Sequence, residues 1–193
     1  MPKVDTRKFY LSAIQKYGVT PRGVQWNSKE HQEIRFDIIL SLLPQDLSSS
    51  TLVDAGCGFG DLYCYLQKKE RLVQKYIGID MLEEMQSIAQ KRTKETILLA
   101  NICTDPLPSA EYYLCSGALN ILTQFESYQF IHNAYKSATK GLIFNLLYGD
   151  KESQTYNYFT KEQIESLAQE LKVQKLCFKD TYLEHDLTVG FFK

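Results

Sequence analysis

Short apolar runs alternate along the middle of this chain with segments whose apolar residues recur every three or four positions. The apolar runs predict strands at about 52–55, 76–79, 97–99, 112–115 and 142–144. The longer spacing predicts amphipathic helices at about 61–68, 82–91 and 124–138. Short apolar strands between amphipathic helices are typical of a parallel sheet covered on both faces. The pattern therefore predicts an α/β fold.

The two ends of the chain depart from this alternation. Helical patterns at about 7–17 and 27–43 precede the first strand, and Asn27 with Glu30 is predicted to cap the second of them. Near the other end, Thr160 with Gln163 predicts a capping box for one more helix.

The last two apolar runs, 173–178 and 187–191, have only a polar turn between them. Strands without a crossover helix pair antiparallel, so the sequence predicts a C-terminal hairpin.

A glycine-rich turn joins the first predicted strand to the helix after it. Residues 53–61 read VDAGCGFGD, so an acid precedes three glycines in G-x-G-x-G spacing. Such a turn lets the backbone approach a ligand closely and present free N–H groups to it. The dinucleotide fingerprint G-x-G-x-x-G would need a glycine at position 61, where this chain has Asp61. A dinucleotide site is therefore disfavoured.

The acid before the first glycine and the G-x-G-x-G spacing resemble the first motif of class I S-adenosylmethionine-dependent methyltransferases. The resemblance covers about residues 27–193. It implies a Rossmann-like, seven-stranded, mostly parallel sheet with helices on both faces, a C-terminal antiparallel hairpin and an N-terminal helical extension. We expect a single methyltransferase domain over 1–193, made of a helical cap at 1–45 and a Rossmann-like core at 46–193. The implied cofactor is S-adenosyl-L-methionine.

The resemblance also implies roles for polar residues at the strand ends. Asp54 would bond the ammonium group of the cofactor, and Asp80 would accept both ribose hydroxyls. Asn101 would take the adenine amino group, with the backbone N–H of Ile102 on a ring nitrogen. A helix cap for Asp80 and a turn for Asn101 are the structural alternatives. Ser116 belongs to a stretch of small residues that would leave room for the sulfonium.

Other candidates come from the second N-terminal helix and from single residues. Gln32 and Arg35 share a helical face, and Arg35 would pair either with the cofactor carboxylate or, on the surface, with Glu30 or Asp37. Trp26 and Met81 belong either to the pocket or to the core. The predicted cofactor-binding residues are Asp54, Ala55, Gly56, Cys57, Gly58, Gly60, Asp80, Met81, Asn101, Ile102, Ser116, Arg35, Gln32 and Trp26.

The acceptor of the methyl group is left open by the sequence. Residues 116–120 contain neither the Asn/Asp-Pro-Pro-aromatic box of amino-methylating DNA enzymes nor the Pro-Cys of pyrimidine C5 enzymes, so methylation of nucleic-acid bases is disfavoured. Walls from residues 116–120, Asn145 and the tyrosine-rich loop 148–158 suit a flat or hydroxylated small molecule. A catalytic base is not identified; His31 and Asn145 are the candidates.

Two other functions remain open at this point. One is an RNA or protein methyltransferase that needs a partner subunit, and the other is a non-catalytic S-adenosylmethionine-binding module.

The composition of the chain limits its possible partners and its cellular compartment. The net charge of −1 gives no basic field for nucleic acid, and no apolar run reaches the roughly 20 residues that a membrane span requires. Five cysteines without a C-x-x-C pair predict a reduced, cytoplasmic protein without structural zinc. We expect no metal site and no membrane partner, and the oligomeric state is undetermined.

Overall fold

The computed structural model describes residues 4–193, so residues 1–3 of the expected cap lie outside the described part. Its helices are α1 (Thr6–Tyr17), α2 (Lys29–Ser41), α3 (Asp61–Lys68), α4 (Glu83–Thr93), α5 (Gln124–Ser137) and α6 (Lys161–Glu170), with short 3-10 turns η1 (Pro21–Val24) and η2 (Ala118–Ile121). Its strands are β1 (Leu47–Ala55), β2 (Val73–Asp80), β3 (Thr96–Leu99), β4 (Ala110–Ser116), β5 (Ala138–Tyr148), β6 (Tyr158–Phe159), β7 (Lys175–Lys179) and β8 (Asp186–Phe192).

The strands form one sheet in the order β3-β2-β1-β4-β5-β8-β7. Neighbours among β1 to β5 pair parallel, whereas β8 pairs antiparallel with both β5 and β7. The predicted parallel sheet and C-terminal hairpin are confirmed. The two-residue strand β6, which pairs with the end of β5, was not predicted. Because β2 and β4 lie on opposite sides of β1, the strand order reverses there, and such a switch point is where α/β sheets bind ligands.

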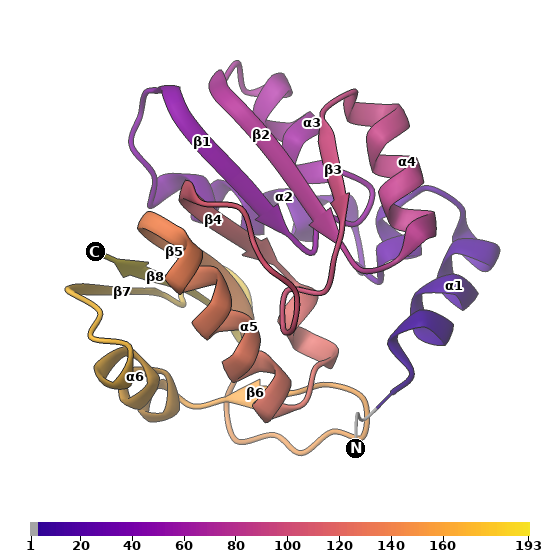
Figure 1. Ribbon diagram of the computed structural model, residues 1–193. Coiled ribbons are helices and arrows are strands. Elements are labelled where there is room, and N and C mark those ends of the chain that lie inside the picture. Colours follow the sequence, from indigo (N-terminus) through magenta and orange to yellow (C-terminus); the bar gives the residue numbers. More distant parts are fainter. Residues whose placement is uncertain (1–3) are drawn as a thin grey trace.

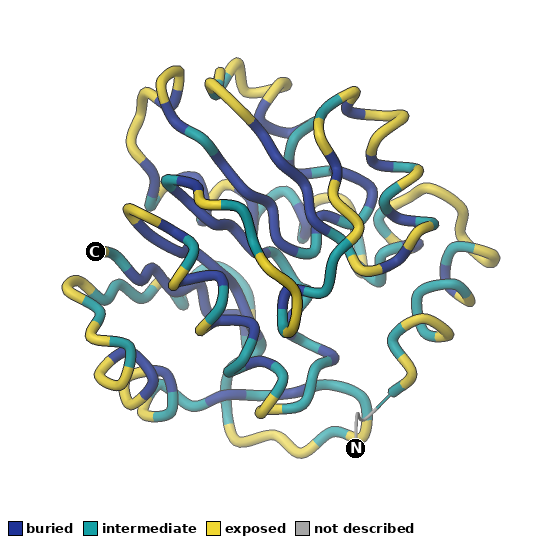
Figure 2. The backbone as a smooth tube through the Cα atoms, viewed as in Figure 1, coloured by how far each residue is buried: buried dark blue, intermediate teal, exposed yellow. Residues whose placement is uncertain are grey.

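Helices cover both faces of the sheet, with α5 in front and α2 behind in the view of Figure 1. Adjacent strand residues point to opposite faces, so Leu52 packs with Phe36 of α2 and Leu66 of α3, whereas Val53 packs with Ile131 of α5. Figure 2 shows the consequence, since the central strands are buried along most of their length.

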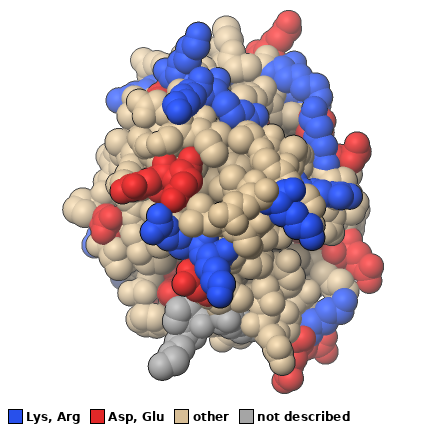
Figure 3. All heavy atoms as spheres, turned by 90° about the vertical axis from the view of Figure 1, so that its right-hand side faces the viewer, with Lys and Arg blue, Asp and Glu red and all other residues tan. Residues whose placement is uncertain are grey.

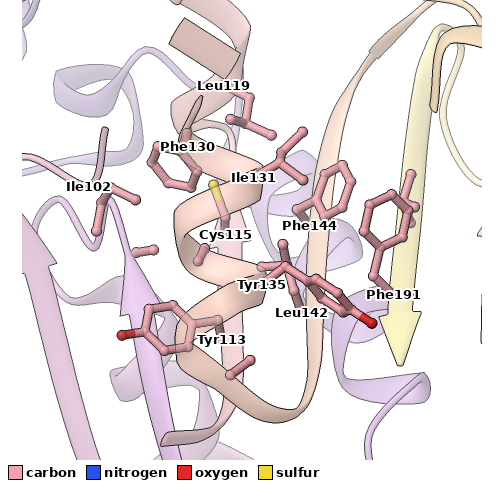
Figure 4. Close-up of a cluster of buried hydrophobic side chains, with 14 of the residues drawn as sticks. Ile102, Tyr113, Cys115, Leu119, Phe130, Ile131, Tyr135, Leu142, Phe144 and Phe191 are labelled. Atoms are coloured by element: carbon pink, nitrogen blue, oxygen red, sulfur yellow. The ribbon is translucent and has the colours of Figure 1, made fainter. Parts of the chain in front are cut away.

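The larger core cluster lies between α5 and the sheet, and Figure 4 shows its aromatic and aliphatic side chains interlocking. Phe144 of β5 meets Phe191 of β8 edge to face, with ring centroids 5.3 Å apart. Cys115 of β4 points into the same cluster and is fully buried. This packing holds the carboxyl end of β4 in a fixed position beside β5.

The helix caps correct one prediction and confirm another. Ser28, not Asn27, caps α2, because its hydroxyl accepts the N–H of His31. Thr160 and Gln163 form the predicted capping box of α6, with both of its hydrogen bonds present. The first error is a shift of one position between two residues that are both good caps.

The surface carries charges of both signs. Basic and acidic side chains are interspersed on the face shown in Figure 3, and neither sign covers it. Within residues 4–193, no helix combines the length and the apolar character that crossing a membrane requires.

Candidate functional site

The carboxyl ends of β1 and β2 meet beside the glycine turn. The N–H groups of Gly56 and Cys57 both donate to the carbonyl of Ile79, at 2.8 and 3.0 Å. This pairing ties the turn after β1 to the end of β2. It brings Asp54, near the end of β1, and Asp80, the last residue of β2, to the same edge of the sheet.

Two glycines of the turn are required by its geometry. Gly56 has a φ of +77°, and a Cβ there would lie 2.5 Å from the Cβ of Ala118. Gly58 has a φ of +54°, and its N–H donates to Asp80 at 2.9 Å. Both positive φ values disfavour residues with a side chain. The turn therefore passes close to η2 without a side chain that would fill the space.

Asp80 holds two backbone segments together with its two oxygens. Oδ2 accepts the N–H of Gly58, and Oδ1 accepts the N–H of Leu82 at 3.0 Å, next to the start of α4. Burial raises the pKa of this carboxyl to about 6, although these N–H donors act in the opposite direction. Asp80 is not the N-cap of α4, because Leu82 holds that position without a side-chain cap bond. Asp80 instead orders the backbone just before the helix.

Asp54 lies deeper and has a different partner. Its side chain is almost fully buried, and it accepts a hydrogen bond of 2.7 Å from the hydroxyl of Tyr76. Burial raises its pKa to about 7, the Tyr76 bond lowers it, and the nearby charge of Asp80 adds to the rise. Asp54 and Asp80, which lie at the same edge of the sheet, therefore both have raised pKa values.

Both acids line one cavity. The space between its walls is about 1160 Å³ when the open solvent at its mouth is included. The predicted residues that line it are Asp54, Gly56, Cys57, Gly58, Asp80, Met81, Asn101, Ile102, Ser116, Gln32 and Trp26. Folding thus brings together residues from α2, from the η1–α2 connection and from the ends of four strands.

Three predicted residues do not line this cavity: Ala55, Gly60 and Arg35. Ala55 is fully buried in the core. Gly60 caps α3 with a φ of +76°, and a Cβ there would meet Thr93 of α4 at 2.5 Å. These two positions support the turn from outside the cavity.

Arg35 is the clearest correction. Its guanidinium forms a fork on Asp186 at the start of β8, with Nε 2.7 Å from Oδ1 and a second bond from NH2 to Oδ2. NH1 donates to the carbonyl of His31, and the guanidinium lies 4.6 Å from the ring of Trp26. Arg35 is buried, so the expected surface partners Glu30 and Asp37 do not hold it, and its donors are turned away from the cavity.

The end of β3 provides the side of the cavity that the sequence assigned to adenine. Asn101 forms a turn, since its Oδ1 accepts the N–H of Cys103 at 2.9 Å. Ile102 is buried beside it. Met81 is 47% exposed, so the alternative of an ordinary core methionine is wrong. Asn101 therefore makes the turn considered for it and also lines the cavity, whereas its contact with adenine stays a prediction.

Neither catalytic candidate lines the cavity. His31 lies in the first turn of α2. Asn145 is fully buried beneath the segment after β4, where its Oδ1 accepts the N–H of Gly117 and its Nδ2 donates to Ser116. The structure thus gives Asn145 a supporting position under two residues of the cavity.

Tyr10 of α1 is a lining residue that sequence reasoning did not identify. It is half-buried, and removal from solvent raises its pKa, with contributions from the charges of Asp80, Cys115 and Tyr156. The available signal was the apolar pair of Tyr10 and Ile14, which packs on Met85 and Phe59. That pattern shows which face of α1 is buried, but it does not show what the face covers.

Comparisons with known proteins agree with this geometry. Residues 53–142 match a family model described as a methyltransferase domain. The chain is also similar to three solved structures at low sequence identity. The first is magnesium protoporphyrin IX methyltransferase from Synechocystis PCC 6803 with bound SAH, with 15% identity, coverage of 84% of this chain and 83% of that chain, and a TM-score of 0.69.

The second is human N-acetylserotonin methyltransferase in complex with SAM, with 16% identity, coverage of 98% and 60%, and a TM-score of 0.71. The third is a SAM-dependent methyltransferase from Leishmania major, with 18% identity, coverage of 98% and 85%, and a TM-score of 0.71. No curated protein sequence matches the chain.

The chain therefore has the Rossmann-like fold of the class I S-adenosylmethionine-dependent methyltransferases, as its sequence predicted. The match to the methyltransferase domain model, residues 53–142, runs from β1 into β5 and includes the glycine turn and both acids.

Proposed function

We propose that this protein transfers the methyl group of S-adenosylmethionine to a small acceptor molecule held in the same cavity. The observation that carries the proposal is the meeting of Asp54, Asp80 and the glycine turn at one cavity wall. Within residues 4–193 neither carboxylate has a cationic partner, and such a pair suits a ligand that brings positive charge and hydroxyl donors.

The acids have capacity left for such a ligand. An ionised carboxylate has about four acceptor sites, and the two oxygens of Asp80 use one each on Gly58 and Leu82. Two sites therefore remain for the ribose hydroxyls. Asp54 has one bond, from Tyr76, and its remaining sites would take the ammonium group.

The neighbouring residues fit the rest of the cofactor. The amide oxygen of Asn101 keeps a second lone pair after bonding Cys103, and this lone pair would accept the adenine amino group. Gly56 and Gly58 leave the backbone uncovered where the methionine portion would pass. Gln32 donates to Asp61 at 3.0 Å and lines the same wall.

The cofactor supplies a methyl group that is already activated, so the protein mainly has to position the acceptor and exclude water. Trp26 and Tyr10 cover the cavity from the N-terminal side. Because no histidine or lysine lines it in the described chain, we propose an acceptor whose nucleophilic atom does not depend on a strong protein base. We further propose that residues 1–193 act as one domain, with residues 1–45 as its helical cap and residues 46–193 as its core.

Two measurements test the proposal. S-adenosylmethionine is expected to raise the melting temperature, and no shift at millimolar cofactor would contradict the cofactor site. A metabolite extract incubated with methyl-labelled cofactor is expected to yield a labelled product and S-adenosylhomocysteine. Tight cofactor binding with no product in any extract would support the non-catalytic binding module instead.

A further inference from the structure

Tyr76 of β2 places a buried hydroxyl beside Asp54, the more deeply buried acid of the cavity. The residue is 1% exposed, and its hydroxyl donates to Oδ2 of Asp54 at 2.7 Å. In the parallel pairing of β1 with β2, Tyr76 is opposite Leu52 and Asp54 is opposite Gly78, so the bond runs diagonally between the two strands. A fully buried tyrosine hydroxyl therefore has an acid of the cavity as its partner.

The ring of Tyr76 is held in place by its neighbours. It packs against the ring of Tyr63 of α3, with centroids 4.8 Å apart, and it belongs to a core cluster that includes Cys57 and Ala89. These contacts fix the position of the hydroxyl, and with it the carboxylate that it bonds. Tyr63 makes the same kind of bond, since its hydroxyl donates to Glu95 at 2.6 Å, but Glu95 does not line the cavity.

The other surroundings of Asp54 disfavour its negative charge. Burial raises the pKa of Asp54 to about 7, and the charges of Asp80, at the end of β2, and Asp61, at the start of α3, add to the rise. The remaining titratable neighbours are the thiols of Cys57, after β1, and Cys115 of β4; burial raises the pKa of both, so both stay neutral. Among the groups of residues 4–193 that act on the pKa of Asp54, the tyrosine hydroxyl is the one that lowers it.

Resting on the proposed function, we infer that Tyr76 is a positioning residue of the cofactor site, which holds the carboxylate of Asp54 in place and stabilises its charged form for a cationic ligand. The attraction between that charge and an ammonium or sulfonium group acts through space, because a buried site screens it weakly, so it does not require direct contact with the acid. Tyr76 itself does not line the cavity, and it acts on the ligand only through Asp54.

The test compares Tyr76→Phe with the wild-type full chain by calorimetry between pH 5.5 and 8.5, with S-adenosylhomocysteine as the ligand. The substitution keeps the ring and removes the hydroxyl, so the pKa of Asp54 should rise further, by about one pH unit. Since the ammonium group of the ligand favours the ionised acid, the variant should bind about tenfold more weakly at pH 5.5. At pH 8.5 the acid is mostly ionised in both proteins, so the two affinities should agree within about twofold.

Two further variants assign the effect to the bond between Tyr76 and Asp54. Asp54→Asn removes the titrating acid, so adding Tyr76→Phe to it should change the affinity by less than about twofold at every pH. Tyr63→Phe is the matched control, because it removes a tyrosine hydroxyl that bonds a carboxylate outside the cavity, and it should leave the pH profile of binding unchanged.

A second variant tests the same bond even if Tyr76→Phe fails to fold. Replacement of Tyr76 by 3-fluorotyrosine keeps the hydroxyl, and the fluorine withdraws electrons from it, so the hydroxyl becomes a stronger donor to Asp54. The pKa of the acid should then fall, and the affinity for S-adenosylhomocysteine at pH 5.5 should rise by about twofold, which is the opposite direction to Tyr76→Phe.

A merely structural role of Tyr76 predicts a loss of affinity that is the same at every pH, and that result would overturn the inference. So would an equal loss from Tyr76→Phe in the Asp54→Asn background, or weaker binding by the 3-fluorotyrosine variant at pH 5.5. A wild-type protein that binds no S-adenosylhomocysteine at any pH would instead contradict the proposed function, so the two failures are distinguishable.

Discussion

Two places at the carboxyl edge of the sheet hold aspartates that are largely removed from solvent, and the two places differ in what offsets the charge. At the β5–β8 end, Asp186 receives a two-pronged bond from the guanidinium of Arg35. At the β1–β2 end, Asp54 and Asp80 receive only a tyrosine hydroxyl and backbone N–H groups. The first carboxylate has a cationic partner in the chain, whereas the second pair has none among residues 4–193.

The presence or absence of a cationic partner distinguishes Asp186, which has a structural role, from Asp54 and Asp80, which are able to bind a ligand. Burial raises the pKa of Asp186, but the Arg35 guanidinium opposes that rise directly. No such cation opposes the rise at Asp54 and Asp80, which reach about 7 and about 6. Acids with shifted pKa values that share a cavity are typical of functional sites. A buried ion pair such as Arg35–Asp186 is typical of a structural role.

The largest expected effect comes from breaking the matched pair. Asp186→Leu leaves the Arg35 guanidinium buried without its partner, and the free energy of unfolding should fall by about 3–5 kcal/mol. Urea denaturation measures this change. The double variant Arg35→Met with Asp186→Leu should recover most of the loss, because neither charge then remains buried. Equal losses in the single and double variants would show that packing, not charge, holds this region.

Substitution of Asp80, which has no cationic partner among residues 4–193, should affect cofactor binding more than stability. Asp80→Ala is expected to weaken S-adenosylmethionine binding by about 1–3 kcal/mol, because hydrogen bonds to the ligand are lost. The loss of stability should be smaller than for Asp186→Leu, since no cation is left buried without a partner. Calorimetry measures the binding, and Asp80→Asn, which keeps one acceptor oxygen without the charge, should give an intermediate affinity. An unchanged affinity of Asp80→Ala for S-adenosylmethionine would show that Asp80 only orders the backbone at Gly58 and Leu82.

The raised pKa values of Asp54 and Asp80 also predict how the stability of the free protein depends on pH. With pKa values raised above the ordinary 3.8, the folded protein holds protons on Asp54 and Asp80 that the unfolded chain has released. That contribution to stability is present below about pH 4 and is lost as the pH rises through about 7, so the free protein should melt at lower temperature at pH 8 than at pH 5.5.

Cofactor binding should follow the opposite trend, because a cationic ligand favours the ionised acids. Affinity is expected to rise below pH 7 by up to about tenfold per pH unit for each proton that binding releases. Calorimetry in buffers with different ionisation enthalpies counts these protons. A pH-independent affinity between 5.5 and 8 would indicate that the acids are already ionised in the free protein.

The smallest expected effect concerns the apolar rim next to Asp80. Met81 lines the cavity but is half exposed, so Met81→Ala should weaken cofactor binding by at most about 1 kcal/mol. Leu99→Ala is the matched control, because Leu99 is exposed to a similar degree but does not line the cavity. Equal effects of Met81→Ala and Leu99→Ala on affinity would show that Met81 does not contact the cofactor.

The sequence by itself determined the order of strands and helices, the glycine turn and the acids at the strand ends. Each of these depends on neighbouring residues: apolar periodicity, the positive φ of Gly56 and Gly58, and the capping of α6 by Thr160 all act within a few positions. Because parallel strands end at a common edge, local patterns were enough to bring Asp54 and Asp80 together.

Only the tertiary structure decided the partners that lie far apart in the chain. Arg35 meets Asp186 across 151 positions, and no periodicity near either residue indicates that the other will bury beside it. The cover that Tyr10 provides over the cavity likewise depends on how α1 docks against the rest of the chain. Local free energies set which elements form, but the competition among burial, charge and hydrogen bonding is resolved only when distant surfaces come into contact.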